Sequence, residues 1–160
     1  MAQPGRMLAL DVGDRTIGVA ASDELGITAN PVETIRRKSF KADLARIGEL
    51  VAQRQAVRVV VGLPLMLDGS HGVQVEKVST FIDKLRPTLP VPVVLWDERL
   101  STVAAERALI QSGLTRKRRK QVIDQVAAVY FLQGFLNYLS LHPEVDPDRF
   151  GALPPRDDAG

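Results

Sequence analysis

An acidic side chain ends the first apolar run of the sequence. Asp11 follows residues 7–10, and strand alternation gives it the same face as Met7 and Ala9. An ordinary strand end explains such an acid equally well. Asp11 is therefore a candidate functional residue mainly if other acids meet it.

An acidic pair ends a later apolar run. Asp97 and Glu98 follow residues 93–96, and alternation turns their side chains to opposite faces of a strand. Only one of them can point into a given site, and the pattern leaves open which one.

Asp124 lies within a predicted helix over 121–141. Its neighbours on the same helical face are apolar, namely Ala127, Ala128, Phe131, Leu132 and Phe135. A carboxylate directed at a core needs hydrogen-bond donors, an arginine or a metal ion. A single buried acid of this kind is more often structural than functional.

The elements that must position these acids follow from the hydrophobic pattern. We predict strands at 7–12, 16–21, 27–35, 57–61 and 91–96, and helices at 40–55, 75–85, 103–111 and 121–141. Three short strands with tight connections predict an antiparallel meander, and the later alternation of strands and helices predicts parallel pairing. The predicted fold class is α/β, a five-stranded mixed sheet flanked by helices. Pro31 weakens the third strand or places it at an edge.

This arrangement lets the acids converge. Parallel strands bring their carboxyl ends to one edge, and Asp11 and Glu98 both lie at such ends. Asp124 joins them if the last helix crosses the first strand with its N-terminal part at that edge. Three adjacent carboxylates need a counter-charge, and hard oxygen ligands favour Mg²⁺ or Mn²⁺. The implied site is a divalent metal centre.

Composition excludes several other classes of protein. The 160 residues fit one domain, and 45% hydrophobic with 25% charged residues is typical of a globular chain. The absence of Cys excludes disulfide scaffolds, thiolate zinc sites and cysteine nucleophiles. The N-terminal residues do not resemble a signal peptide, and the apolar runs are too short for a membrane span. We expect a cytoplasmic protein with no membrane partner.

Charge is unevenly distributed along the chain. The densest basic run comprises Arg116, Lys117, Arg118, Arg119 and Lys120, which would suit a phosphate backbone or, equally, a solvated helix entrance. Residues 142–160 are acidic and rich in Pro, so we expect a flexible tail without regular structure after a domain at 1–141.

Several motifs together carry a resemblance to a known family. They are Leu10-Asp11-Val12-Gly13, Thr16-Ile17-Gly18-Val19-Ala20, Val61-Gly62-Leu63-Pro64-Leu65, Asp68-Gly69-Ser70, Asp97-Glu98-Arg99-Leu100-Ser101-Thr102 and Ile123-Asp124-Gln125-Val126-Ala127-Ala128. Each is weak alone, but in this order and spacing, over about residues 7–139, the chain resembles the bacterial YqgF/RuvX family of RNase H-like nucleases.

The resemblance implies an RNase H-like fold and a catalytic, metal-binding triad at Asp11, Glu98 and Asp124, which selects Glu98 over Asp97. It also implies a nuclease that trims the 5′ end of pre-16S rRNA in ribosome biogenesis, although some members are described as Holliday-junction resolvases. Members usually have Asn where this chain has Met66, which removes one polar contact from the loop.

The resulting hypothesis is hydrolysis of a phosphodiester bond with two Mg²⁺ or Mn²⁺ ions held by the triad. Residues 116–120 would hold the flanking phosphates. Thr16 and Asp14 in the first turn would position substrate, although such residues are more often ordinary surface turn residues. Arg99 would contact phosphate or, equally, form a structural ion pair. The loop Leu63–Gly72 would close over the strand being cut or serve only as a connection.

Other functions remain open. Asp11, Gly13 and Gly18 also resemble the phosphate loop of actin-like and sugar-kinase ATPases, but 160 residues would supply only half of their nucleotide cleft. A non-catalytic nucleic-acid-binding module would tolerate loss of the acids. A resolvase would be expected to form a homodimer with paired sites, whereas a monomer can trim rRNA.

Overall fold

The computed structural model describes residues 5–64, 72–97 and 116–152, with the backbone alone for 116–124. Its strands are β1 (Arg6–Val12), β2 (Thr16–Ser22), β3 (Ala29–Arg36), β4 (Ala56–Leu63) and β5 (Val93–Asp97). The α-helices are α1 (Phe40–Arg54), α2 (Val73–Leu85) and α4 (Arg116–Leu141), and the short 3-10 helices are η1 (Arg86–Thr88) and η2 (Pro147–Phe150). The predicted helix at 103–111 lies outside the described residues.

The strands form one mixed sheet in the order β3-β2-β1-β4-β5. β2 pairs antiparallel with both β1 and β3, whereas β4 pairs parallel with both β1 and β5. This confirms the predicted five-stranded sheet of a meander followed by parallel strands. Pro31 lies in β3, which is an edge strand as its proline requires.

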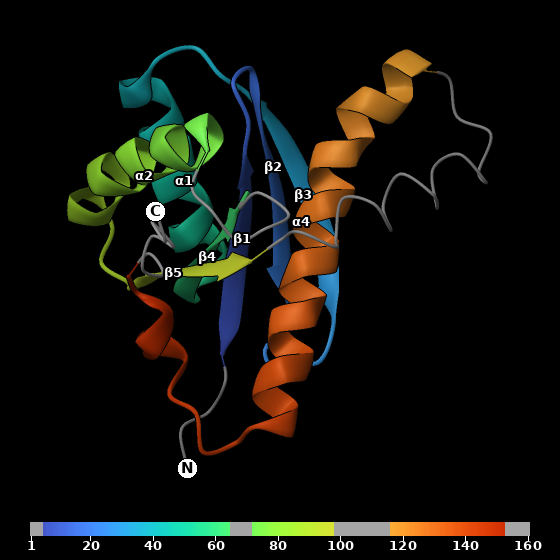
Figure 1. The fold of residues 1–160 in the computed structure, drawn as a ribbon, viewed down its shortest axis with the longest axis vertical. Coiled ribbons are helices and arrows are strands. Elements are labelled where there is room, and N and C mark those ends of the chain that lie inside the picture. The colour runs from blue at the N-terminus through green and yellow to red at the C-terminus, as the bar shows by residue number, and fades with distance from the viewer. Residues whose placement is uncertain (1–4, 65–71, 98–115, 153–160) are drawn as a thin grey trace, which may run out of the picture.

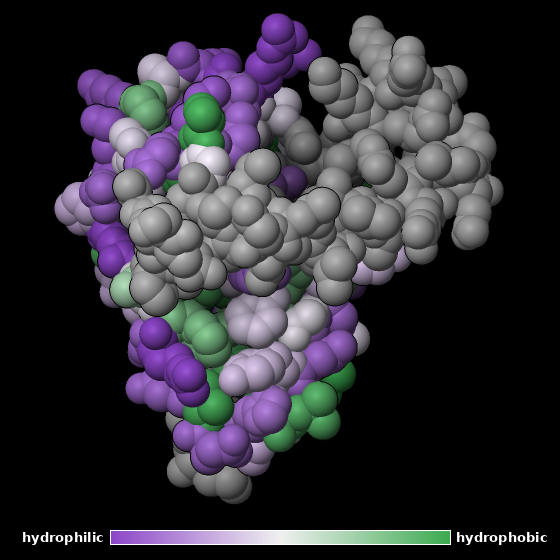
Figure 2. Space-filling model, viewed as in Figure 1, coloured by the Kyte–Doolittle hydropathy of each residue, from purple (hydrophilic) through white to green (hydrophobic). Residues whose placement is uncertain are grey.

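Helices cover both faces of the sheet (Figure 1). One core lies between the sheet and helices α1 and α2, and residues such as Leu8, Leu10 and Ile47 are fully buried in it. The outer surface of this helical layer is mostly hydrophilic (Figure 2). A second core lies between the opposite face and α4, and it includes Met7 and Ala9 from β1. Strand alternation thus gives the sheet an α1/α2 face and an α4 face.

Helix α4 packs on the sheet with the apolar stripe that the sequence predicts. Its buried residues are Ala127, Ala128, Phe131, Leu132, Phe135 and Leu136. The helix begins at Arg116 rather than at the predicted residue 121, so the basic run 116–120 forms its first turns instead of preceding it. Arg and Lys are good helix formers, so the charges do not prevent the helix from starting there.

Residues 142–152 differ from the expectation of an irregular tail. They include η2, whose Phe150 ring lies 5.5 Å from Trp96 and 5.7 Å from Phe135 between centroids. Arg58 Nε lies 2.7 Å from Asp148 Oδ1, and an arginine in η1 donates to the carbonyl oxygen of Gly151. Aromatic packing and ion pairing therefore hold this segment on β5 despite its prolines. In the part of the chain that the structure describes, we find no helix long and apolar enough to cross a membrane.

Candidate nucleic-acid cleavage site

The carboxyl ends of β1, β3, β4 and β5 lie at one edge of the sheet, because these four strands run in the same direction. We call this edge the rim. Helix α4 brings its N-terminal half to the rim, since Gln125 Nε2 donates to Thr34 Oγ1 at 2.7 Å near the end of β3. Further along α4, Gln133 bonds the backbone of Ile27 and Ala29 near the start of β3, at 2.9 and 3.0 Å. Helix α4 therefore runs antiparallel to β3, with its first turns at the rim end of the molecule (Figure 1).

Asp11 lies near the rim on the α4 face. It follows Met7 and Ala9 in strand alternation, and both are buried beneath α4. In register, Asp11 pairs with Gly18 of β2, and Gly18 pairs with Thr34 of β3. Gly18 has no side chain, so the half-buried Asp11 has no bulky neighbour on β2 at this position. Asp11, Gly18 and Thr34 thus form a row of paired residues across β1, β2 and β3. This row ends at Thr34, which lies beneath Gln125, the residue that follows Asp124 in α4.

A second row lies one step closer to the rim. Thr16 pairs with Arg36, and alternation places both on the α4 face, two residues along the strands from Gly18 and Thr34. Thr16 was expected to contact substrate, and it lies on the same face as Asp11. Arg36 is a residue that the sequence analysis missed. Its face follows from the pairing of β2 with β3, so no signal in the sequence identified it.

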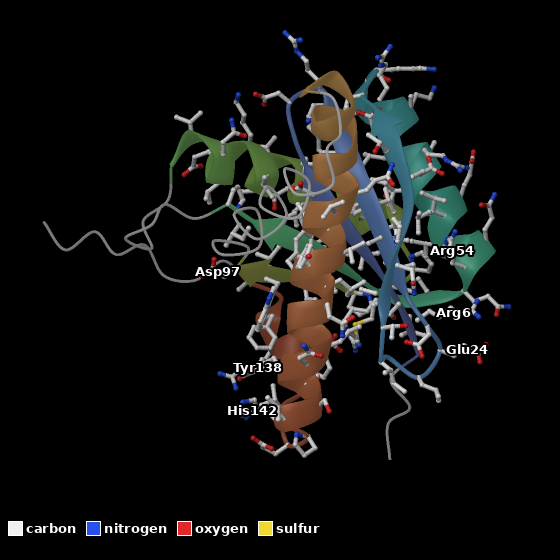
Figure 3. All side chains as sticks on the ribbon, turned by 90° about the vertical axis from the view of Figure 1, so that its right-hand side faces the viewer. Arg6, Glu24, Arg54, Asp97, Tyr138 and His142 are labelled. Carbon is white, nitrogen blue, oxygen red and sulfur yellow. The ribbon has the colours of Figure 1, made fainter. Side chains whose placement is uncertain are left out.

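Asp97 lies on the other face of the sheet. It follows Val93 and Leu95 in alternation, and both belong to the α1/α2 core, whereas Trp96 packs against the α4 core. Asp97 ends β5 opposite Leu63 and lies to one side of α4 in Figure 3. Glu98 and Arg99 lie outside the described residues.

The remaining predicted site residues lie in α4. Its backbone carries Asp124 and the basic residues Arg116, Lys117, Arg118, Arg119 and Lys120, whose side chains lie outside the described residues. The loop residues 65–71 lie outside them as well.

The turn between β1 and β2 is fixed by charged side chains on the α1/α2 side. Arg37 Nη1 donates to the carbonyl oxygen of Gly13 at 2.8 Å, and Arg37 Nε lies 3.3 Å from the buried carboxylate of Asp43. Lys77 of α2 donates to Asp14 at 3.0 Å, and this hydrogen bond lowers the pKa of Asp14 below its ordinary value. Asp14 is therefore an ionised partner of α2 rather than a companion of Asp11.

Among the described side chains, no three His, Asp or Glu residues lie close enough together to hold a metal ion. Of the predicted triad, only the side chain of Asp11 is among them. Its carboxylate, at the rim and beside a glycine, is a hard oxygen donor of the kind that Mg²⁺ and Mn²⁺ prefer.

A family match accounts for this combination of fold and motifs. The sequence model of RuvX, described as Holliday junction resolvase, matches residues 5–138. The chain belongs to the RuvX family. This confirms the resemblance, and the family and the names of its relatives bear out the predicted class of activity, hydrolysis of ester bonds in nucleic acid.

Curated relatives are similar over nearly their whole length. A protein of Myxococcus xanthus named "Putative pre-16S rRNA nuclease" is 48% identical over 93% of this chain and 99% of its own. A protein of Halothermothrix orenii with the same name is 52% identical over 83% of this chain and 95% of its own.

Two solved structures have a similar fold. Thermus thermophilus RuvC in complex with a Holliday junction substrate has a TM-score of 0.54 at 15% identity, covering 84% of this chain and 96% of its own. The Fowlpox virus resolvase with Holliday junction DNA has a TM-score of 0.53 at 12% identity, covering 84% and 98%. At these identities the likeness is one of fold, and it confirms the RNase H-like architecture.

Proposed function

We propose that this protein is a divalent-metal-dependent nuclease that processes the 5′ end of pre-16S rRNA, with Asp11, Glu98 and Asp124 as its metal-binding carboxylates. The observation that carries the proposal is the position of Asp11, at the rim and on the face that α4 covers. The reaction would take place in the cytoplasm together with its substrate.

Strand alternation supports Glu98 rather than Asp97 as the second carboxylate. Trp96 lies on the α4 face and Asp97 on the opposite face, so one more residue of extended chain would return to the face of Asp11.

Helical spacing supports Asp124 as the third carboxylate. Position 124 precedes the buried Ala127, Ala128 and Phe131 by three, four and seven residues, the spacing of one helical face. The bond from Gln125 to Thr34 holds this turn of α4 over the row that contains Asp11.

This donor set suits Mg²⁺ or Mn²⁺, because all three groups are carboxylates. Bound ions of this kind would activate water for in-line attack on the scissile phosphate and stabilise the departing oxygen. The residues of the chain would bind and orient the strand. Thr16, beside Asp11, would position it, residues 116–120 would hold the flanking phosphates, and Arg99, next to Glu98, would contact phosphate. The loop Leu63–Gly72 would cover the strand being cut.

Pre-16S rRNA is the favoured substrate, because relatives with about half of their residues identical carry that name. The second candidate is a Holliday-junction resolvase, which the family description favours. That activity would require a homodimer with two sites, so that two strands are cut symmetrically.

The test incubates the purified protein with Mn²⁺ or Mg²⁺ and either a pre-16S leader RNA or a four-way DNA junction. We expect cleavage of the leader, and a loss of rate of at least about 100-fold in Asp11→Asn, because the metal contribution is worth several kcal/mol. Asp14→Asn is the matched control, since Asp14 lies in the adjacent turn but bonds to α2, and it should cleave at nearly the wild-type rate.

Symmetric nicks in the junction without cleavage of the leader would instead establish the resolvase. If Asp11→Asn cleaves as well as wild type, the proposed metal site is wrong. If Asp11→Asn is inactive in vitro but restores growth to a deletion strain, the protein acts as a non-catalytic binding module.

A further inference from the structure

Four exposed cations gather at the end of the sheet where Asp11 lies. Arg15 belongs to the β1–β2 turn, Arg36 ends β3, and Lys38 and Lys41 flank the start of α1. Figure 2 shows hydrophilic surface at the top of the molecule, above the β1–β2 turn, and Figure 3 shows nitrogen-tipped side chains projecting from the same end. We call these four residues the rim cations.

The rim cations carry an excess of positive charge. Within the described residues none of the four has an ion-pair partner. The nearby Arg37 and Lys77 differ, because Asp43 and Asp14 pair with them. Asp14 and Asp43 are thus already matched to other cations, and a cluster of unmatched cations attracts an anionic partner.

The backbone beneath the rim cations is held in place. The backbone N–H of Arg37 donates to the carbonyl oxygen of Arg15 at 2.8 Å, which joins the turn to the end of β3. The backbone N–H of Lys38 donates to Asp43 Oδ1 at 3.1 Å, and Ser39 caps α1 by accepting from the N–H of Ala42 at 3.1 Å. The cations therefore project from a fixed frame, which lowers the entropy cost of binding an extended ligand.

The rim cations are continuous with the proposed site. Arg36 lies two residues beyond Thr34 on the α4 face, a step of about 7 Å along a strand. Thr34 belongs to the same row as Asp11 and Gly18. A polyanion seated at Asp11 can thus continue past Thr16 to Arg36 and then reach the other cations.

We propose that Arg15, Arg36, Lys38 and Lys41 form a phosphate-binding tract for the substrate RNA strand next to the scissile bond, on the β3 side of Asp11. The proposal rests on the proposed nuclease function and adds a binding path to it. The tract is separate from residues 116–120 of α4 and reads the sugar–phosphate backbone, so it contributes affinity rather than sequence preference.

The test measures binding apart from cleavage. A fluorescently labelled single-stranded pre-16S leader RNA is titrated by anisotropy at several KCl concentrations in the absence of divalent metal. Arg36→Gln is compared with Arg54→Gln, which removes the same charge from the last turn of α1, just before the start of β4 and away from the rim. A quadruple Gln variant of the rim cations is compared with a quadruple Gln variant of Arg6, Arg54, Arg58 and Arg149.

We expect Arg36→Gln to weaken binding about 3- to 10-fold and the quadruple rim variant at least 30-fold. The slope of log affinity against log salt should become shallower by about 0.7 for each lost phosphate contact. The charge-matched controls should keep the wild-type slope, and circular dichroism establishes that every variant is folded.

If the rim and control variants have equal RNA affinities and equal salt slopes, the proposal of a phosphate-binding tract is wrong, even if wild type cleaves the leader. If the quadruple rim variant loses binding to a four-way DNA junction but not to the leader, the assignment of the tract to RNA is wrong. The proposed function fails separately, if wild type with Mn²⁺ leaves the leader intact.

Discussion

Asp11 shows how the two-residue period of a β-strand predicts the face of the sheet on which a side chain lies. The alternation of Met7, Ala9 and Asp11 is visible in the sequence, and the structure buries the first two beneath α4. Arg36 could not be assigned in the same way. The pairing of β2 with β3 shifts register between Val19 and Ala20, and a one-residue shift reverses the face of every later residue.

The charge of Glu33 has an effect on the stability of the fold that can be measured. Its carboxylate accepts two hydrogen bonds from Arg46 of α1, at 2.6 and 3.1 Å, and these bonds lower its pKa below the ordinary value of 4.5. A carboxylate whose pKa is lower in the folded state stabilises the fold at pH values above its unfolded-state pKa. This contribution is lost as the pH falls through the folded-state pKa.

We therefore predict that Glu33→Gln lowers the free energy of unfolding by about 0.5–1 kcal/mol at neutral pH, a partly exposed pair being worth no more. The difference from wild type should be constant above about pH 5.5 and shrink below the ordinary glutamate pKa. Urea denaturation at a series of pH values measures it. Glu49→Gln, which removes a single bond of 2.8 Å from a more exposed acid, should cost less. A difference that persists undiminished at pH 3 would contradict this account.

At the scale of elements, sequence periodicity predicted the strands and helices that depend on local residue patterns. The five strands, α1, α2 and the apolar face of α4 agree with the structure, because each buries a face with its own period. The docking of residues 142–152 was missed, since it depends on contacts between Phe150 and rings from β5 and α4 that are distant in sequence. Strand ends and helical spacing suggested that the carboxylates converge, whereas the choice of Glu98 over Asp97 came from the resemblance, because alternation alone does not state which face of the sheet holds the site.

The attachment of α4 to β3 provides a test of positioning. Gln125→Leu removes the 2.7 Å bond to Thr34 and should cost about 1 kcal/mol of stability. Because Asp124 precedes this residue, we also expect a several-fold rise in the Mn²⁺ concentration that gives half-maximal cleavage.

The matched control is Gln133→Leu, which loses the bonds to Ala29 at the start of β3 and to Ile27 just before it, at the end of the sheet away from the rim. It should be destabilised at least as much and keep the wild-type Mn²⁺ dependence. The same shift in both variants would mean that Gln125 acts only through stability.

The docked segment after α4 can be followed by fluorescence, since Trp96 is the single tryptophan of the chain. Phe150→Ala removes a ring that packs on Trp96, so it should cost about 1–2 kcal/mol and shift the emission to longer wavelength. Leu141→Ala, at a residue that is 77% exposed, is the control and should change neither quantity. Unchanged emission in Phe150→Ala would show that the segment does not cover Trp96 in solution.

At the scale of the whole molecule, the two faces of the sheet have different tasks. Among the described residues, the α1/α2 face holds the larger core, and on this side Arg37 pairs with Asp43 and Lys77 with Asp14. The α4 face combines a smaller core with Asp11, Thr16 and Arg36 near the rim. Stability and substrate binding are thus largely separated, so that substitutions at the rim should change activity more than folding.

The most direct test of this account is a titration of Mn²⁺ followed by electron paramagnetic resonance of the free ion. Wild type should bind Mn²⁺, Asp11→Asn should bind it at least about 10-fold more weakly, and Asp97→Asn, altered on the opposite face of the sheet, should match wild type. Equal binding by wild type and Asp11→Asn, or a loss confined to Asp97→Asn, would contradict a metal centre on the α4 face.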